Sequence, residues 1–416
     1  MVNKTGLPAG TPGMGKKPFT LLWKLSLTAV VAILLSGAVY HKELTRLYHV
    51  VTLFEPDKIA GNFRNMEALF DTRRIQKGET SRPFKRDPGP LPRSFTYKGE
   101  TLDTARFLKE TRTTGLMVIK DDKVRHEQYF LGNTENDKNI SWSMGKSIVS
   151  ALVGIAVHEG AIDDLDKPVS DYVPLLRQSG YNGVSLRNVL QMSSGIGFNE
   201  DYGDFHSDIN RMSRTFALSM PLDDFVVSLK AERDQGIFNH YVSMDTQVLG
   251  MVLRETTGKN LSVYLEEKIW KKAGMESDAL WIIDSRGMEA AFGGLNVVLR
   301  DYARFGLLFL HNGRCGERQV IPAQWIKDSV TPDAPHLMPG KRNNSSWVMG
   351  YGYQWWLPEN TDGDYMAIGI YNQYIYIDPK RGTIVVKLSA YPDYNDDGEE
   401  KTFRSVALFR KIARTM

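Results

Sequence analysis

Alternation of apolar and polar residues predicts β-structure in two widely separated parts of the chain. In residues 115–132, GLMVIKDDKVRHEQYFLG, two β-rich runs flank the pair Asp121-Asp122, a combination that is typical of a β-hairpin. A helix is expected immediately before this hairpin, at residues 101–113, where the apolar side chains can share one face.

The β-rich pattern returns near the C-terminus. Strands are expected in residues 350–357, 365–379 and 383–391. A turn at 379–382 separates the last two runs, and a final helix is expected at about 400–415. Residues 160–290, in between, are mainly helical with long loops. This order predicts an α+β fold, in which an antiparallel sheet from both chain ends is flanked by helices and carries a helical insert.

The segment that begins at residue 143 is apolar nearly all round as far as Val157, which predicts a buried central helix. Gly160 is a typical residue to end it. Ser143 and Lys146 lie at its start, and residues three apart on a helix are neighbours on one face. A lysine in the first turn of a buried helix therefore requires an explanation.

An acyl-transfer nucleophile is one explanation for the Ser143–Lys146 pair. A lysine in apolar surroundings has a lowered pKa and can accept a proton near neutral pH. An oxyanion forming at Ser143 would be stabilised by the unpaired N–H groups and dipole of the first helical turn. The alternative is that Ser143 is merely a helix N-cap, because Ser-x-x-Lys is a short pattern.

A second apolar stretch, residues 19–40, precedes the folded part of the chain. A helix of about 20 such residues spans a bilayer, and the lysines before it predict a cytoplasmic N-terminus. We therefore expect a single-pass anchor in the cell membrane, with the later residues on the periplasmic or extracytoplasmic side. The alternative is a cleaved signal peptide, because Ser36-Gly37-Ala38 are small, and the protein would then be secreted to the periplasm.

These patterns divide the chain into four parts. Residues 1–18 are rich in Gly, Pro and Lys and are expected to be disordered. Residues 19–40 form the expected anchor or signal peptide, and residues 41–94 form a lead-in segment that packs on the domain surface. The remaining residues, 95–416, are expected to form the main domain.

Composition narrows the class of partners and of metal sites. The 52 basic and 49 acidic residues leave a net charge of +3, which gives no reason to expect a nucleic-acid partner. Cys315 is the single cysteine, so an intrachain disulfide and a cysteine-rich metal site are excluded. The pairs His126-Glu127 and His158-Glu159 lack the second histidine of a zinc-binding helix. We therefore expect no metal.

The segment SMGKSIVSALVGIAVHEGAIDDLDKPVSDYVP resembles the serine β-lactamase and penicillin-binding-protein superfamily in its class C and esterase branch. That family has Ser-x-x-Lys, Tyr-x-Asn or Tyr-x-Ser, and a Lys-Thr-Gly-type strand element. The second motif maps to Tyr241-Val242-Ser243. The third maps to Ala367-Ile368-Gly369, where alanine and isoleucine replace the family's lysine and threonine. The resemblance covers roughly residues 95–416 and implies the β-lactamase/transpeptidase-like fold.

The resemblance also implies a division of catalytic roles. Ser143 would be the nucleophile, Lys146 the general base, and Tyr241 the general acid and base that passes the proton to the leaving group. The backbone N–H of Ile370 would be the second oxyanion donor beside that of Ser143. The implied chemistry cleaves a small ester or amide through an acyl-serine intermediate and needs no metal or organic cofactor.

The Tyr-x-Ser and Ala-Ile-Gly-Ile elements are similar to those of the 6-aminohexanoate-dimer hydrolases and their carboxylesterase relatives. The segment SSGIGFNEDYGDF resembles that branch as well, and Tyr202 within it would close over the bound substrate. We expect His240 and Ser243 to line the pocket. Gly369 would let the strand edge approach the substrate closely.

Two other functions remain open at this point. The first is a β-lactamase or D,D-peptidase acting on cell-wall peptides, which Ala367 and Ile368 argue against because the family's lysine and threonine help to hold the drug's carboxylate. The second is a binding module of penicillin-binding-protein type that has lost catalysis, which the intact Ser143, Lys146 and Tyr241 argue against. The natural substrate, the preference for ester or amide and the oligomeric state do not follow from the sequence.

Overall fold

The computed structural model describes residues 51–218, 220–359 and 362–416, together with scattered positions before residue 51. The chain divides into a first unit, Met1–Val51, and a compact second unit, Thr52–Met416. In the first unit the described positions between Trp23 and Val50 are helical. Most of residues 1–18, where disorder is expected, lie outside the described part.

No helix in the described part of the chain is long and apolar enough to cross a membrane. This finding contradicts the membrane anchor expected at residues 19–40, and with it the membrane partner and the location in the cell membrane. An anchor was expected because a mainly apolar stretch of about 20 residues can span a bilayer, with Lys24 close enough to its end to reach the interface. The described positions of that stretch include the polar Lys24, Ser26 and Thr28, and its other residues lie outside the description.

An eight-stranded sheet joins the two ends of the second unit, as the sequence predicts. Its strands, in spatial order, are β12 (Gly350–Tyr351), β13 (Trp356–Leu357), β14 (Tyr365–Gly369), β15 (Gln373–Asp378), β16 (Thr383–Ser389), β5 (Thr113–Lys120), β6 (Lys123–Tyr129) and β2 (Lys85–Arg86). All neighbours are antiparallel except β2 and β6. The pairing of β16 with β5 brings the N-terminal hairpin against the C-terminal strands and confirms the predicted α+β sheet.

Turn residues explain where these strands begin and end. The β5–β6 hairpin turns at Asp121 and Asp122, which have φ values of 48° and 61°, as a tight two-residue turn requires. The single run expected at 365–379 is instead two strands, because Tyr371 and Asn372 also adopt left-handed φ values and reverse the chain between β14 and β15.

A second sheet and two short hairpins complete the β-structure. The four-stranded sheet has the order β1 (Thr72–Ile75), β8 (Ala279–Ile282), β9 (Leu295–Val298) and β7 (Lys138–Ile140). The hairpins are β3 (Ser94–Tyr97) with β4 (Glu100–Asp103), and β10 (Arg314–Cys315) with β11 (Arg318–Gln319). Because β1 pairs with β8, the segment before residue 95 contributes a strand to the same compact unit.

Helices cover both faces of the large sheet. The helices are α3 (Ile59–Asn62), α4 (Thr104–Glu110), α5 (Met144–His158), α6 (Val169–Tyr172), α7 (Leu186–Leu190), α8 (Asp208–Ala217), α9 (Leu222–Ser228), α10 (Ser243–Thr257), α11 (Leu261–Leu265), α12 (Leu299–Leu310), α13 (Ala323–Ser329) and α14 (Tyr394–Thr415). Along β15, Tyr374 and Tyr376 pack against Phe409 of α14, whereas Ile375 lies next to Gly306 of α12. Alternate residues of a strand point to opposite faces, so α12 and α14 lie on opposite sides.

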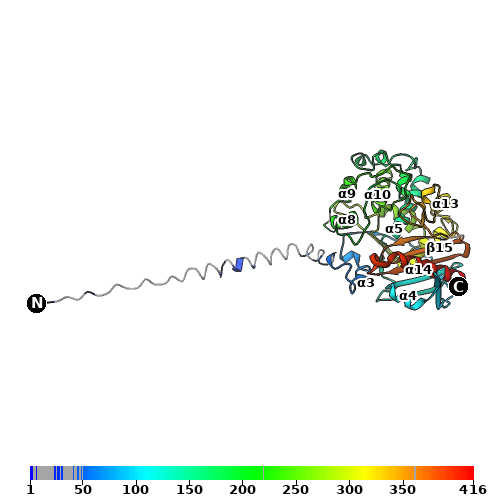
Figure 1. Ribbon diagram of the computed structural model, residues 1–416, viewed down its shortest axis with the longest axis horizontal. Helices are drawn as coiled ribbons and strands as arrows, with labels where there is room; N and C mark the ends of the chain where they lie inside the picture. Colours follow the sequence, from blue (N-terminus) through cyan, green and yellow to red (C-terminus); the bar gives the residue numbers. More distant parts are fainter. Residues whose placement is uncertain are drawn as a thin grey trace. The chain divides into compact units, whose positions relative to one another are not determined.

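The predicted helical insert is present between the two halves of the sheet. Figure 1 shows α8, α9 and α10 gathered on one side of α5, with β15 and α14 on the other side. The contacts of α5 with both α10 and β14 place it at the junction, where its first turn can meet residues from each part. The helix expected at 101–113 is shorter than predicted, because Asp103 caps it by accepting a hydrogen bond from the Arg106 N–H at 2.8 Å.

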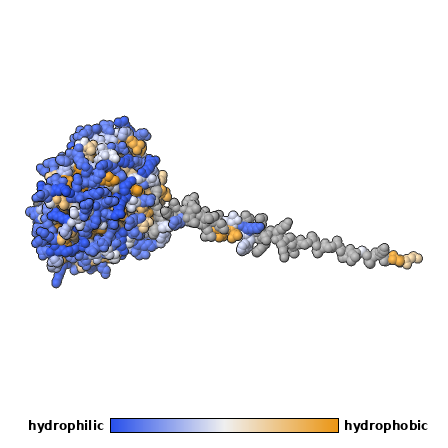
Figure 2. Space-filling view, turned by 180° about the vertical axis from the view of Figure 1, so that it is seen from behind, coloured by the Kyte–Doolittle hydropathy of each residue, from blue (hydrophilic) through white to orange (hydrophobic). Residues whose placement is uncertain are grey.

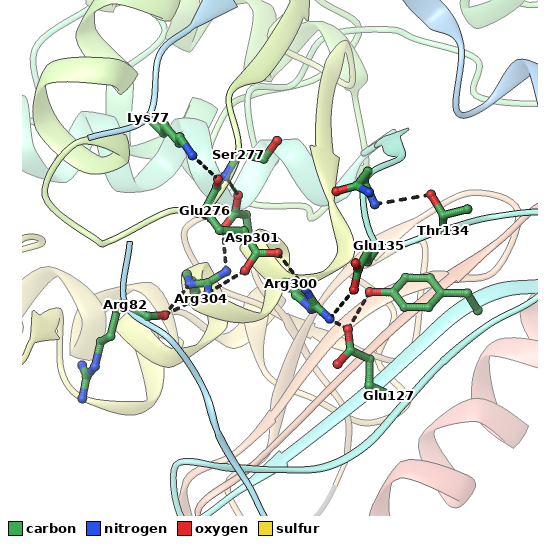
Figure 3. Close-up of polar contacts among 12 residues, drawn as sticks. Lys77, Arg82, Glu127, Thr134, Glu135, Glu276, Ser277, Arg300, Asp301 and Arg304 are labelled. Atoms are coloured by element: carbon green, nitrogen blue, oxygen red, sulfur yellow. Dashed lines mark hydrogen bonds and ion pairs between the residues drawn. The ribbon is translucent and has the colours of Figure 1, made fainter. Parts of the chain in front are cut away.

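Charged residues fasten the outer segments to this core. Arg300 on α12 donates to Glu127 at 2.5 Å, and Arg304 one turn later donates to Glu276 at 2.9 Å and to the Arg82 carbonyl at 2.9 Å (Figure 3). The face of the second unit in Figure 2 is mostly hydrophilic, with small separate hydrophobic spots. The apolar side chains are therefore mainly in the interior, as expected for a folded domain.

Candidate active site

A tight turn places Ser143 at the start of α5. The preceding residue, Trp142, has a φ of 43°, which costs free energy for a bulky residue and is maintained by the surrounding structure. The Ser141 N–H donates to the Leu295 carbonyl at 2.7 Å and fixes the entry to the turn. A Cβ on Gly145 would lie 2.8 Å from the Ser141 hydroxyl oxygen, so a larger residue in the first turn of the helix would require the buried Ser141 side chain to move.

Lys146 lies against Ser143, as the spacing predicts. Its Nζ donates to Ser143 Oγ at 2.9 Å, to Ser243 Oγ at 3.2 Å and to the Phe292 carbonyl at 2.6 Å. The side chain is 2% exposed. Burial lowers the pKa of Lys146 to about 7, although the negative charge of Glu200 acts in the opposite direction. The amine can therefore be neutral near physiological pH and accept the Ser143 proton.

The structure brings Tyr241 to the same point from the residues just before α10. Its ring stacks on Trp356, with 5.4 Å between the centroids, and the Lys146 Nζ lies 5.2 Å from the centroid of the Tyr241 ring. Burial, followed by the charge of Glu200, raises the pKa of Tyr241 well above its usual value, and a hydrogen bond with Ser143 lowers it. The phenol is thus protonated at neutral pH and can supply a proton.

The end of β14 lies beside the nucleophile. A Cβ on Gly369 would be 2.8 Å from the Ser141 carbonyl oxygen, so this close approach requires glycine. Neither the Ser143 nor the Ile370 N–H has an acceptor in the part of the chain that the structure describes. The turn after Ile370 is held by the buried Lys387, whose Nζ donates a hydrogen bond to the Asn372 carbonyl at 3.1 Å.

A cavity of about 350 Å³ opens above Ser143. It is lined by Ser143, Glu200, Asp201, Tyr202, Tyr241, Ser346, Trp347, Trp356, Ile368, Ile370, Tyr394, Asn395 and Glu399. Three of these side chains are carboxylates, five are aromatic, and none of these lining residues is an arginine, lysine or histidine. The cavity is therefore both aromatic and acidic, a combination that attracts a cationic group.

The four residues expected to bind substrate have different positions. Tyr202 lines the cavity and donates to Glu200 at 3.1 Å. Ser243 is buried and accepts the hydrogen bond from Lys146 described above. The His240 ring forms a hydrogen bond with the Phe198 carbonyl at 2.9 Å and is absent from the residues that line the cavity. Gly369 provides the close contact with Ser141.

Glu200 and the Phe292 carbonyl are parts of the site that were not predicted from the sequence. Glu200 accepts a hydrogen bond from the Ser243 N–H at 2.6 Å, which fixes its carboxylate near Lys146. It lies in an irregular loop, where no periodic pattern marks a residue. The Phe292 carbonyl precedes Gly293, and a Cβ on Gly293 would be 3.1 Å from the Trp142 backbone. The glycine pair at 293–294 could therefore have indicated that this segment packs closely against another part of the backbone.

Replacement of Glu200 by glutamine should move the acid limb of the activity profile to lower pH. Glutamine retains the acceptor for Ser243 but removes the charge that raises the pKa of Lys146, so the lysine would lose its proton at lower pH. The pH dependence of kcat/KM, measured from about pH 5 to 9, reports this midpoint. Asp201→Asn is the control, and an equal shift in that variant would argue against a specific effect of Glu200.

No group of three or more His, Cys, Asp or Glu side chains that could hold a metal ion occurs among the described residues. The polar groups around Ser143 include an amine, hydroxyls, a phenol and backbone N–H groups, beside the carboxylates that line the cavity. Those are the components of acid–base and nucleophilic catalysis.

Comparison with known proteins identifies the family. The Beta-lactamase family model matches residues 104–408. The 6-aminohexanoate-dimer hydrolase of Paenarthrobacter ureafaciens is 30% identical over 339 residues, which cover 80% of this chain and 85% of that protein. A putative 6-aminohexanoate-dimer hydrolase from Bacillus anthracis has a similar fold, with a TM-score of 0.77 at 22% identity over 87% of this chain and 95% of that one.

A family VIII carboxylesterase also has a similar fold, with a TM-score of 0.57 at 16% identity, covering 75% of this chain and 95% of that one. The similar proteins thus include one described as a 6-aminohexanoate-dimer hydrolase and one described as a carboxylesterase. The family model covers most of the chain, including Ser143, Lys146 and Tyr241. The protein therefore belongs to the Beta-lactamase family and is a hydrolase of that superfamily.

Proposed function

We propose that the protein is a serine hydrolase that cleaves amides or esters through a covalent acyl-serine intermediate. The observation that carries this proposal is the 2.9 Å hydrogen bond between the buried Lys146 amine, whose pKa is lowered to about 7, and the Ser143 hydroxyl. A poised base in contact with a hydroxyl at a helix N-terminus is an arrangement that activates a nucleophile.

In the acylation step, Ser143 Oγ attacks the substrate carbonyl while Lys146 takes the hydroxyl proton. The negative oxygen of the tetrahedral intermediate accepts hydrogen bonds from the Ser143 and Ile370 N–H groups. Tyr241 donates its phenolic proton to the departing amine or alcohol and is reprotonated from Lys146. The leaving group departs neutral, and the acyl group remains bound to Ser143.

In the deacylation step, a water molecule attacks the acyl-serine carbonyl. Its proton passes to Tyr241 and Lys146, the same oxyanion donors stabilise the second intermediate, and Ser143 Oγ leaves with a proton returned from these residues. The products are a free carboxylic acid and the regenerated serine. Apart from the attacking water, these steps use only side chains and N–H groups of this chain.

The lining of the cavity supports a substrate that carries an ammonium group. Glu200, Asp201 and Glu399 line it together with five aromatic side chains, and a carboxylate on the substrate would meet no cation among the lining residues. The relative from Paenarthrobacter is described as a 6-aminohexanoate-dimer hydrolase, and the linear dimer of that compound is an amide with an ammonium on its acyl half and a carboxylate on its leaving half. A β-lactam carries a carboxylate, and Ala367 and Ile368 replace the side chains that would hold it, so the β-lactamase alternative is disfavoured.

Three p-nitrophenyl esters of equal chain length test this proposal: those of 6-aminohexanoic, hexanoic and adipic acid. We expect all three to be hydrolysed, with kcat/KM highest for the amine and lowest for the carboxylate, roughly fivefold per step because exposed charges interact weakly. High salt should narrow the differences. If the folded protein hydrolyses none of the three esters, the proposed hydrolase is rejected and a binding module is favoured. If it hydrolyses all three with equal kcat/KM, only the proposed charge preference is rejected.

A further inference from the structure

An aromatic cluster from the segment before the catalytic region packs beside the nucleophile. Phe54 stacks on Tyr371, with centroids 5.4 Å apart and the ring planes 18° apart, and lies 5.9 Å from Trp142. Phe63 contacts the same two rings edge-on, at 5.0 Å from Tyr371 and 5.3 Å from Trp142. The four rings form one group, which we name the aromatic clamp.

The two inner members of the aromatic clamp are adjacent to the proposed oxyanion donors. Trp142 immediately precedes Ser143, and Tyr371 immediately follows Ile370. Both have left-handed backbones, with φ values of 43° and 64°. Such conformations are unfavourable for aromatic residues and persist only where the surroundings enforce them. The rings of Phe54 and Phe63 supply that packing, because each contacts both strained residues at once.

The lead-in segment is fastened to the domain independently of the rings. Arg112 donates to the Pro56 carbonyl at 2.8 Å, and Arg64 donates to the Leu131 carbonyl at 3.0 Å. The Ile140 N–H donates to the Phe63 carbonyl at 2.9 Å, directly before the nucleophile turn. The outer rings thus have a fixed support. Both lie before residue 104, where the family match begins, so they are additional to the matched region.

We propose that Phe54 and Phe63 are positioning residues that set the distance between the Ser143 and Ile370 N–H groups. This inference rests on the proposed function, because it assigns a task to the lead-in segment in the same oxyanion site. Phe63 is 2% exposed and belongs to the core, whereas Phe54 is 44% exposed. Removal of the Phe54 ring therefore disturbs the clamp with less effect on folding, which makes Phe54 the better position to test.

We expect Phe54→Ala to lower kcat for the 6-aminohexanoyl ester about tenfold with little change in KM, since a displaced donor weakens transition-state binding. The affinity for a phenylboronic acid, which forms a tetrahedral serine adduct, should fall by a similar factor. Phe54→Tyr retains the stacked ring and should restore both values. A purely structural role would lower the melting temperature without moving kcat and boronate affinity together.

Phe84→Ala is the matched control. Phe84 is a half-buried phenylalanine of the same lead-in segment, and its ring lies 4.3 Å from the guanidinium of Arg304. We expect kcat to stay within about twofold in this variant, because Phe84 belongs neither to the aromatic clamp nor to the residues that line the cavity at Ser143. If the wild-type protein is active and kcat is unchanged in Phe54→Ala, the positioning role of the aromatic clamp is rejected and the proposed hydrolase is not. An inactive wild-type protein that folds would instead overturn the proposed hydrolase.

Discussion

Replacement of Ser143 by alanine is expected to lower kcat for every ester and amide substrate by about 10⁵-fold, because the variant has no atom that can carry the acyl group. Residual catalysis would come from binding and the oxyanion donors alone. The fold should survive, since Lys146 retains its bonds to Ser243 and to the Phe292 carbonyl. The measurement is single-substrate kinetics, with the intact mass after fluorophosphonate treatment as an independent readout.

Ser150→Ala is the matched control for this experiment. Ser150 is a buried serine on the same helix, and its hydroxyl has no hydrogen-bond partner among the described residues. Its removal should leave kcat and the fluorophosphonate adduct unchanged. Wild-type protein should gain one adduct, and the labelled peptide should contain Ser143. An adduct that persists in Ser143→Ala, or turnover that falls by less than about tenfold, would place the nucleophile elsewhere.

The parts of this site that follow a local rule could be predicted from the sequence. Ser143 and Lys146 meet because they are three residues apart on one helix, and the apolar residues after them identify that helix as buried. The β5–β6 hairpin follows from the Asp121-Asp122 turn and the alternation on each side. The pairing of N-terminal with C-terminal strands could be predicted because β-rich segments occur near both ends of the domain and the segment between them is mainly helical.

The parts that depend on long-range packing could not be predicted in this way. Glu200 lies in a loop without periodicity, and the Phe292 acceptor is a backbone atom that any residue could supply. Phe54 and Phe63 belong to a segment that the sequence indicates only as a surface lead-in, yet they reach the nucleophile turn through contacts with Trp142 and Tyr371. Apolar length alone also led to the wrong prediction of a membrane anchor.

Replacement of Lys146 by methionine is expected to lower kcat by about 10⁴-fold, the upper range for loss of a general base. Methionine fills a similar volume and cannot accept the Ser143 proton. Lys120→Met is the matched control, because Lys120 is a half-buried lysine that also donates to a backbone carbonyl, that of Ala413 at 2.8 Å. The control should retain wild-type kcat. Comparable losses in both variants would indicate a general effect of removing a lysine.

The pH dependence separates a catalytic Lys146 from a structural one. The neutral amine is the active form, so wild-type kcat/KM should rise with pH through a midpoint near 7, where Lys146 loses its proton. Stability should change in the same direction. The unfolded amine has a pKa of 10.5 and the folded amine one of about 7, so between these values the unfolded state binds the extra proton and stability increases with pH. In Lys146→Met both dependences should be lost, and the melting temperature near pH 7 should be equal to or higher than that of the wild type. A destabilised variant with an unchanged activity midpoint would contradict the assignment of Lys146 as the base.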